Sequence, residues 1–437
     1  MLSNSQHKFR KILNDLKRRP EDAAQDLCVT ETKIENILNG KEEITFDLIK
    51  KAISVWPVNF VDFFNIEDDT SNGYKIFSLK DSDNTKRKMY RGGKPYYLYK
   101  DTVMSKVSPF RPEWIQQLTV VNDDDPNNKS VKYNNGHFLH QFTYFVGPVN
   151  FYYIENNVKK VAKMNTGDSV YISPYIPHTF TTRKNKESIH GYILALTYSD
   201  KIDSDGLNEL TAIGYDNAKN IRIKLNDELE AFKSSLNYHF NNSSMSKEVF
   251  YKLTKNKLDD LNAINTLPDF EILKKICDTL SIGLRELLPT IKKEEVKIKK
   301  YSESLKWFFP SEIYKKYMIV ELANIPQLPF SKSLEISTIE EKENDVTFQV
   351  PTHQFLYNVG NQTCIIKLNN KDKQEFNPGD SIYLKPGVKF KFIKKSKILI
   401  LRIGGRIAGD CLLQMSTLSE NDFKRLISDN KSWFNSN

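Results

Sequence analysis

The sequence predicts an α+β protein built from two tandem repeats, each a helix-turn-helix-like unit followed by a β-barrel. The segment Thr30–Lys51 (TETKIENILNGKEEITFDLIKK) aligns without a gap with Thr254–Lys275 (TKNKLDDLNAINTLPDFEILKK). Further on, HQFTYFVG at 140–147 matches HQFLYNVG at 353–360, and GDSVYISP at 167–174 matches GDSIYLKP at 379–386. Such internal repetition fixes the architecture. We expect helical units at 1–75 and 221–295, and barrels at 76–220 and 296–437.

The helical unit is indicated by apolar residues that recur every three or four positions, such as Ile34, Ile37 and Leu38. The Asn39-Gly40 pair is a stop signal, and Thr45 is a start signal for a second helix. Short helices joined by tight turns are typical of a helix-turn-helix unit.

The barrel is indicated by alternating apolar residues, Phe142, Tyr144 and Val146, which continue beyond Gly147-Pro148. Short strands separated by turn signals favour a small antiparallel double-sheet barrel of the cupin type.

Composition places the chain among globular proteins, because 39% of its 437 residues are hydrophobic and 12% are aromatic. We expect no membrane span and no secretion signal. Four separated cysteines are expected to be buried, reduced thiols in a cytoplasmic protein. The net charge of +9 is diffuse, so nucleic acid is not the expected partner.

The segment from Asn134 to Gln141, with Gly167-Asp168-Ser169 and Pro177-His178, resembles the two cupin motifs. In that pattern Asn135 takes the place of the first histidine, and the candidate metal ligands are His137, Gln141 and His178. Residues four apart on a strand point the same way, so His137 and Gln141 are expected to face the barrel interior. Three ligands on one face leave open positions, as in non-heme iron(II) oxygenases. The second repeat has Val350 and Phe390 in place of the histidines, so it is expected to be degenerate.

The whole layout resembles the phosphonate-processing iron enzymes, in particular the tandem-cupin group that contains hydroxyethylphosphonate dioxygenase and methylphosphonate synthase. The dioxygenase pattern has a glutamate ligand six residues before the motif-two histidine, where this chain has Ile172. The synthase pattern has glutamine in the acid position and isoleucine at the glutamate position, which Gln141 and Ile172 match.

The resemblance also implies phosphonate-binding residues: Lys17, Arg91, Tyr99 and Asn134. Lys17, Tyr99 and Ile172 are the residues expected to influence the chemistry. Arginine and lysine suit a phosphonate, which carries close to two negative charges.

The implied reaction is Fe(II)- and O₂-dependent cleavage of 2-hydroxyethylphosphonate to methylphosphonate and carbon dioxide or bicarbonate, in a homo-oligomer. One alternative is the dioxygenase reaction, which gives hydroxymethylphosphonate and formate. A second is a helix-turn-helix regulator with a cupin sensor, although Glu31 and Glu35 on the expected recognition helix argue against phosphate contact. A third is an ordinary cupin isomerase or thiol dioxygenase, which would not account for the phosphonate-binding set.

Overall fold

The computed structural model describes residues 4–108, 110–198, 202, 204–254, 264–291, 294–339, 345–428 and 431–433. The chain divides into two compact units. Unit 1 comprises residues 1–69, 105–107 and 407–437, and unit 2 comprises residues 70–104 and 108–406. Residues 255–263 of the second helical repeat lie outside the described part of the chain.

Unit 1 is helical. Its elements are α1 (Asn4–Leu16), α2 (Pro20–Asp26), α3 (Glu31–Leu38), α4 (Phe46–Val55), η1 (Phe60–Phe63), α12 (Asp410–Ser416) and α13 (Glu420–Ile427). The Thr30 and Thr45 hydroxyls accept hydrogen bonds from the N3 backbone amides of α3 and α4. Gly40 follows α3 with φ +75°, so the expected stop and start signals are confirmed. The spaced apolar residues, Ile34 and Ile37 among them, form one core.

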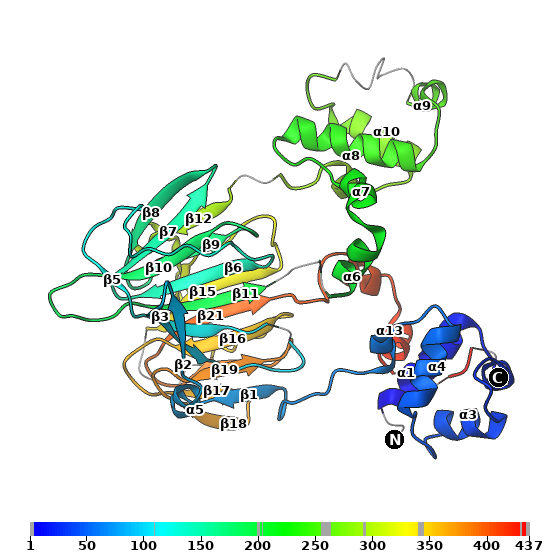
Figure 1. The fold of residues 1–437 in the computed structure, drawn as a ribbon, viewed down its shortest axis with the longest axis horizontal. Helices are drawn as coiled ribbons and strands as arrows, with labels where there is room; N and C mark the ends of the chain where they lie inside the picture. Colours follow the sequence, from blue (N-terminus) through cyan, green and yellow to red (C-terminus); the bar gives the residue numbers. More distant parts are fainter. Residues whose placement is uncertain are drawn as a thin grey trace. The chain divides into compact units, whose positions relative to one another are not determined.

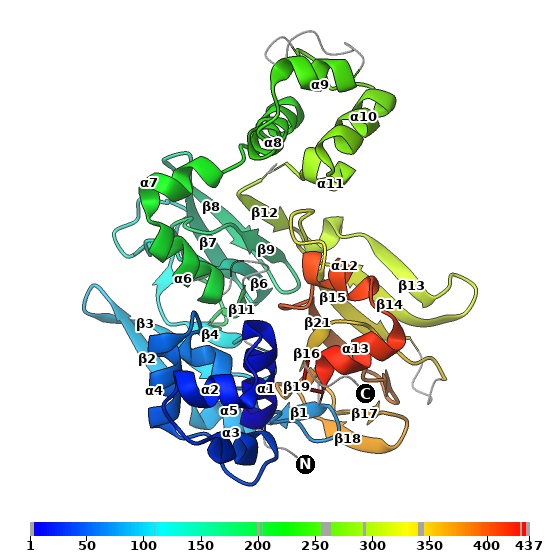
Figure 2. The same cartoon turned by 90° about the vertical axis from the view of Figure 1, so that its right-hand side faces the viewer.

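Unit 2 contains a second helical segment between its two sets of strands. Its elements are α6 (Ser204–Ile213), α7 (Tyr215–Ala218), η2 (Lys219–Ile221), α8 (Glu228–Asn242), α9 (Lys247–Leu253), α10 (Phe270–Leu280) and α11 (Leu284–Leu287). Phe232, Phe250 and Ile276 are fully buried in its core. Figure 2 shows α8 to α11 clustered around this core.

The first β-unit consists of a seven-stranded and a four-stranded sheet. The larger sheet has the order β12-β9-β6-β11-β4-β3-β2, and the smaller has the order β5-β10-β7-β8. The bounds are β2 (Arg87–Arg91), β3 (Lys94–Asp101), β4 (Glu113–Gln117), β5 (Val120–Val121), β6 (His140–Val146), β7 (Val149–Glu155), β8 (Val158–Met164), β9 (Ser169–Ile172), β10 (His178–Arg183), β11 (Tyr192–Tyr198) and β12 (Val296–Lys299). All described pairings are antiparallel except that of β5 with β10.

The second β-unit repeats this arrangement with sheets β1-β19-β16-β21-β15-β14-β13 and β18-β17-β20. The bounds are β1 (Tyr74–Phe77), β13 (Lys306–Pro310), β14 (Lys315–Glu321), β15 (Ser331–Thr338), β16 (His353–Asn358), β17 (Cys364–Leu368), β18 (Asp372–Phe376), β19 (Ser381–Leu384), β20 (Phe390–Phe392) and β21 (Lys397–Ile403), with α5 (Leu79–Asn84) after β1 and a 3₁₀ turn, η4 (Tyr301–Glu303), after β12. The matched motifs therefore occupy equivalent strands, β6 with β16 and β9 with β19.

The two β-units exchange their first strands. Strand β1 precedes the first β-unit in the chain but pairs with β19 of the second, and β12 precedes the second but pairs with β9 of the first. Figure 1 shows the blue β1 beside the orange β19, and the yellow-green β12 beside β9. Asp168 accepts a hydrogen bond from the Tyr301 backbone N–H (2.9 Å), and Asp380 from that of Leu79 (2.7 Å). The aspartate of each Gly-Asp-Ser motif thus binds the backbone of the segment that the other half contributes, just after its exchanged strand.

The predicted α+β class is confirmed, whereas the boundaries at residues 75, 220 and 295 stay a prediction. No helix in the described ranges is long and apolar enough to cross a membrane. The expectation that all four cysteines are buried is wrong for Cys28 and Cys411. Cys28 lies in the turn after α2 with φ +46°, and Cys411 lies in the first turn of α12, which has no buried residues. Neither thiol is therefore part of a core.

Candidate metal centre

His137 and His178 present the same ring nitrogen to the site, because the other nitrogen of each is bonded to the backbone. The His137 Nδ1 lies 2.8 Å from the Leu139 carbonyl oxygen, and the His178 Nδ1 lies 2.8 Å from that of Ile176. A carbonyl can only accept, so each Nδ1 carries the proton and each Nε2 keeps its lone pair in the neutral ring. A hydrogen bond from Nδ1 to a backbone carbonyl is typical of histidines that bind a metal through Nε2. The ring centroids are 5.3 Å apart.

Gln141 completes the set by directing an oxygen at His137. Its Oε1 lies 2.9 Å from the His137 Nε2, and its Nε2 donates to the Thr143 hydroxyl at 2.8 Å. With the Gln141 amide in this orientation and the proton of His137 on its Nδ1, the two facing atoms are both acceptors. Two facing lone pairs require a cation that both atoms bind, or a proton on the ring. The donor set therefore fits a divalent metal.

Burial keeps His178 in the neutral form that a metal requires. Its side chain is 4% exposed. Burial lowers the pKa of His178 to about 4, the Ile176 carbonyl opposes this shift, and the nearby His137 and Arg91 add to it. The imidazole is consequently available as a neutral ligand near neutral pH.

Both the oxygen and the nitrogen of the Asn134 side-chain amide make hydrogen bonds. Its Oδ1 accepts from the backbone N–H of Gly136 (3.0 Å) and of His178 (2.8 Å), which leaves its Nδ2 3.3 Å from the His178 Nε2. The Asn134 N–H groups thus point to the same space as the imidazoles, where an anionic ligand could accept from them.

Arg91, at the end of β2, contacts Thr179, which follows His178 on β10. Its Nη1 donates to the Thr179 hydroxyl (3.1 Å) and to the Lys132 carbonyl (2.6 Å). The guanidinium also stacks over the rings of Tyr96 and Tyr97, at 5.2 and 5.0 Å from their centroids. Arg91 thus brings a fixed positive charge beside the histidines.

Tyr99 and Ile172 line the same interior as the ligands. Tyr99 packs against the buried cluster that contains Ile172 and Phe180. The centroids of the Tyr99 and Tyr97 rings are 5.9 Å apart. Burial raises the pKa of Tyr99, so its hydroxyl stays a hydrogen-bond donor. Ile172 is fully buried and is the cross-strand neighbour of Gln141, which places an apolar side chain where the dioxygenase pattern has a carboxylate.

Lys17 belongs to unit 1, whereas the other predicted residues belong to unit 2. It is exposed, follows α1 with φ +56°, and has its Nζ 5.4 Å from the centroid of the Trp433 ring. The role of Lys17 stays a prediction.

The second β-unit reproduces the backbone of this site without its ligands. The Gly387 N–H donates to the Val350 carbonyl as the Tyr175 N–H donates to that of His137 (both 2.8 Å). The Phe348 N–H donates to the Phe390 carbonyl as the Asn134 N–H does to that of His178. These contacts support the expectation that Val350 and Phe390 stand in the histidine positions.

Thr143 is a site residue that the sequence interpretation missed. Its hydroxyl fixes the Gln141 amide. A comparison of the repeats contained the signal, because Thr143 is replaced by Leu356 in the half that lacks the histidines. No group of three His, Cys, Asp or Glu side chains that could hold a metal occurs in the described ranges.

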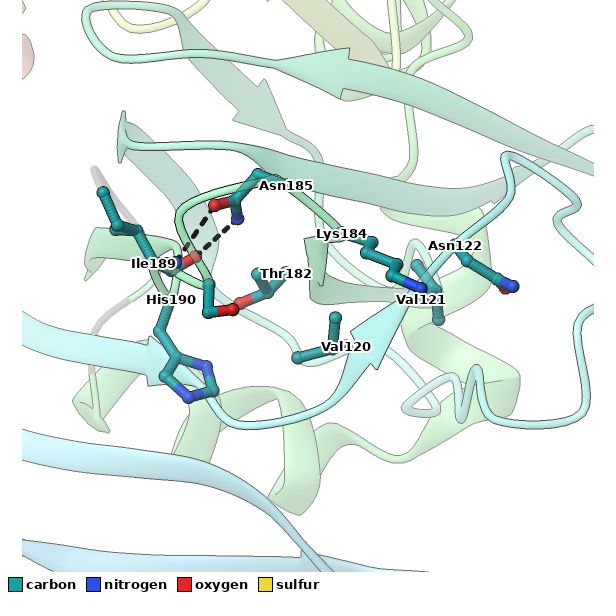
Figure 3. A pocket seen from close by; sticks show the side chains of 9 residues that line it. Val120, Val121, Asn122, Thr182, Lys184, Asn185, Ile189 and His190 are labelled. Carbon is teal, nitrogen blue, oxygen red and sulfur yellow. Dashed lines mark hydrogen bonds between the residues drawn. The ribbon is translucent and has the colours of Figure 1, made fainter.

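A cavity of about 540 Å³ lies elsewhere on the first β-unit, between β5, the end of β10 and the turn at 184–190. Figure 3 shows Lys184, Asn185 and His190 around it. None of the predicted site residues lines this cavity.

The repeated α+β fold and the convergent donors together define a mononuclear metal-dependent enzyme. No family model matches the chain. A methylphosphonate synthase of Nitrosopumilus maritimus (strain SCM1) is 43% identical over 441 aligned residues, which cover 99% of this chain and 96% of that protein. At this identity and coverage, the chain belongs to the methylphosphonate synthase family.

Solved structures agree with this assignment. The 2-hydroxyethylphosphonate dioxygenase of Streptomyces albus, with 2-hydroxyethylphosphonate and Fe(II) bound, superimposes with a TM-score of 0.93 and 32% identity over 99% of both chains. The protein PhpD with cadmium has a TM-score of 0.74 and 15% identity over 97% of this chain and 99% of its own, and shows the fold alone.

Proposed function

We infer that this chain is an iron(II)- and O₂-dependent oxygenase that cleaves 2-hydroxyethylphosphonate to methylphosphonate and carbon dioxide or bicarbonate. The observation that carries the inference is the 43% identity to a methylphosphonate synthase over nearly the whole chain. The reaction balances without a further reductant, since 2-hydroxyethylphosphonic acid plus O₂ equals methylphosphonic acid, CO₂ and water. All four electrons that reduce O₂ come from the substrate.

We further propose that each β-unit is a cupin and that only the first holds iron. His137, Gln141 and His178 would be its ligands, supported by the lone pairs that converge there. Bound iron(II) would supply the Lewis acidity and the redox chemistry for O₂. The three protein ligands are neutral, so the anionic substrate would supply the compensating charge.

The remaining residues would bind and orient the substrate. Arg91 and Asn134 would bind the phosphonate, which suits a guanidinium held near His178 and an amide whose N–H groups lie beside the His178 Nε2. Tyr99 would donate a hydrogen bond from its protonated hydroxyl. Lys17 stays in the proposal on the family resemblance alone, as do the homo-oligomer and the cytoplasmic location.

Ile172 favours the synthase reaction over the dioxygenase alternative. A buried isoleucine beside Gln141 adds no ligand, whereas a glutamate there would occupy a further metal position. The alternative product, hydroxymethylphosphonate with formate, uses the same substrate and oxidant, so only product identity separates the two.

The test is ³¹P NMR of protein loaded anaerobically with iron(II), given 2-hydroxyethylphosphonate and then air. A methylphosphonate signal supports the proposal. Hydroxymethylphosphonate would keep the site and overturn the product assignment. No turnover, with no substrate-dependent iron binding, would reject the proposed function.

A further inference from the structure

The second β-unit keeps one polar ligand position although both histidine positions are apolar. Gln354 stands where Gln141 stands in the first β-unit, and its cross-strand neighbour Leu384 stands where Ile172 stands. The other neighbour of Gln354 is Arg402 on β21, which takes the position of Thr197 on β11. The two histidine positions are apolar in this half, whereas the glutamine position is not. The buried amide of Gln354 therefore needs an explanation.

The Gln354 amide donors are buried and have no acceptor among the described residues. Its side chain is 0% exposed, and its Oε1 accepts from the Arg402 Nε at 3.2 Å. Because Nε can only donate, the oxygen must face Arg402 and the Nε2 must point away. In the described ranges this Nε2 has no hydrogen-bond partner. In the first β-unit Thr143 accepts from the same amide, but its counterpart Leu356 cannot.

Arg402 adds a largely buried positive charge beside Gln354. Burial lowers the pKa of Arg402 to about 10, and no charged partner is among the causes. A guanidinium has five N–H groups, of which the bond to Gln354 uses one, so four remain. Among the residues that the structure describes, Arg402 makes no ion pair. Lys332, its cross-strand neighbour on β15, adds a second cation near it.

An unsatisfied buried polar group costs free energy. The Gln354 amide and the Arg402 guanidinium lie side by side on β16 and β21. Their unused N–H groups at one place therefore indicate a ligand that satisfies them together.

We propose that the second β-unit binds a small oxyanion, such as a phosphate, phosphonate or carboxylate, through Arg402 and Gln354. This position has no histidine lone pairs to bind a cation and offers hydrogen-bond donors instead. The guanidinium offers paired N–H groups that match two oxygens of such an anion. Arg402 is partly exposed, so the anion has a route from solvent. This proposal does not depend on the proposed function.

The test is an equilibrium titration of the metal-free protein with inorganic phosphate, followed by calorimetry and by the unfolding midpoint. Arg402→Met should lower the apparent phosphate affinity of the second β-unit by about tenfold or more. Because this variant retains Arg91, any phosphate binding in the first β-unit is the same in the variant and the wild type. The difference between their titrations therefore reports the second β-unit alone. Parallel titrations with acetate and with methylphosphonate distinguish a planar from a tetrahedral ligand, and Arg402-dependent binding of either supports the site.

Gln354→Glu provides a second test that does not remove the cation. The new carboxylate would face Arg402 and take the place of the ligand. We expect this variant to be more stable than the wild type in anion-free buffer and to lose the phosphate-dependent rise of its midpoint. Equal phosphate responses in the wild type, Arg402→Met and Gln354→Glu would overturn the proposal. So would a response that Arg91→Met abolishes and Arg402→Met leaves intact.

Discussion

Replacing Thr143 with valine should weaken iron binding although Thr143 is not itself a proposed ligand. Thr143 is 0% exposed, and its hydroxyl accepts the bond that turns the Gln141 oxygen toward His137. Valine has nearly the same shape but no acceptor, so the buried amide loses its partner and its orientation. A lost bond of this kind costs about 1–3 kcal/mol. Since about 1.4 kcal/mol corresponds to tenfold, the iron(II) affinity should fall by roughly 5- to 150-fold.

The assay is an anaerobic competition titration of iron(II) against a chelator, with Thr143→Ser as the matched control. Serine keeps the hydroxyl, so its affinity should stay close to that of the wild type. Circular dichroism checks that both variants fold. Wild-type affinity in Thr143→Val, or equal losses in both variants, would refute the argument that this bond orients the ligand.

The structure predicts four further experimental outcomes. Ile172→Glu should change the ³¹P NMR product ratio by adding a competing ligand beside Gln141, and an unchanged product and rate would mean that position 172 does not adjoin the iron. Gly136→Ala should cut turnover by about tenfold or more, because its Cβ would lie 2.5 Å from the Tyr175 carbonyl carbon, next to His137. Gly93→Ala is the control for turnover, since Gly93 has a similar φ of +76° but no atom within 4 Å of the added Cβ. Iron(II) affinity should rise when 2-hydroxyethylphosphonate is added, because the protein ligands are neutral, and equal affinities in calorimetry would contradict this. Burial lowers the pKa of His353 from 6.5 to about 4, so the unfolded chain takes up the proton first as the pH falls. The contribution of neutral, buried His353 to the free energy of unfolding is therefore complete above pH 6.5 and is lost between pH 6.5 and 4. Between these two pH values, His353→Asn should lose up to about 3 kcal/mol less stability than the wild type, measured by urea unfolding at each pH.

The sequence predicted the helix signals and the strand pattern because these depend on local chemistry. Thr30 and Thr45 cap helices whichever fold surrounds them. The prediction that His137 and Gln141 share a strand is wrong, because His137 precedes β6 and a bend at 138–139 separates it from the strand, but the two side chains do meet. The repeat comparison extended this to the degenerate half through Val350 and Phe390. The α+β class and the family followed from the same patterns.

Other features depended on partners that are distant in the chain. Nothing near β1 indicates that it pairs with β19, about 300 residues later, rather than with its own half. The tautomers of His137 and His178 follow from backbone carbonyls whose direction a sequence does not specify. Arg402 has an unremarkable sequence context, and only the register of β21 against β16 brings it to Gln354. Lys17 was predicted by resemblance, which assigns a role but no geometry.

The exchange of β1 and β12 makes each half of the chain structurally dependent on the other. Val296 on β12 is the cross-strand neighbour of Ile172, so the edge of the sheet that carries Gln141 is supplied by the segment that leads into the other half. A chain that ended after the first half would leave β9 unpaired on one side, and β1 would have no sheet to join. Neither β-unit is therefore expected to fold with complete sheets when the other is removed.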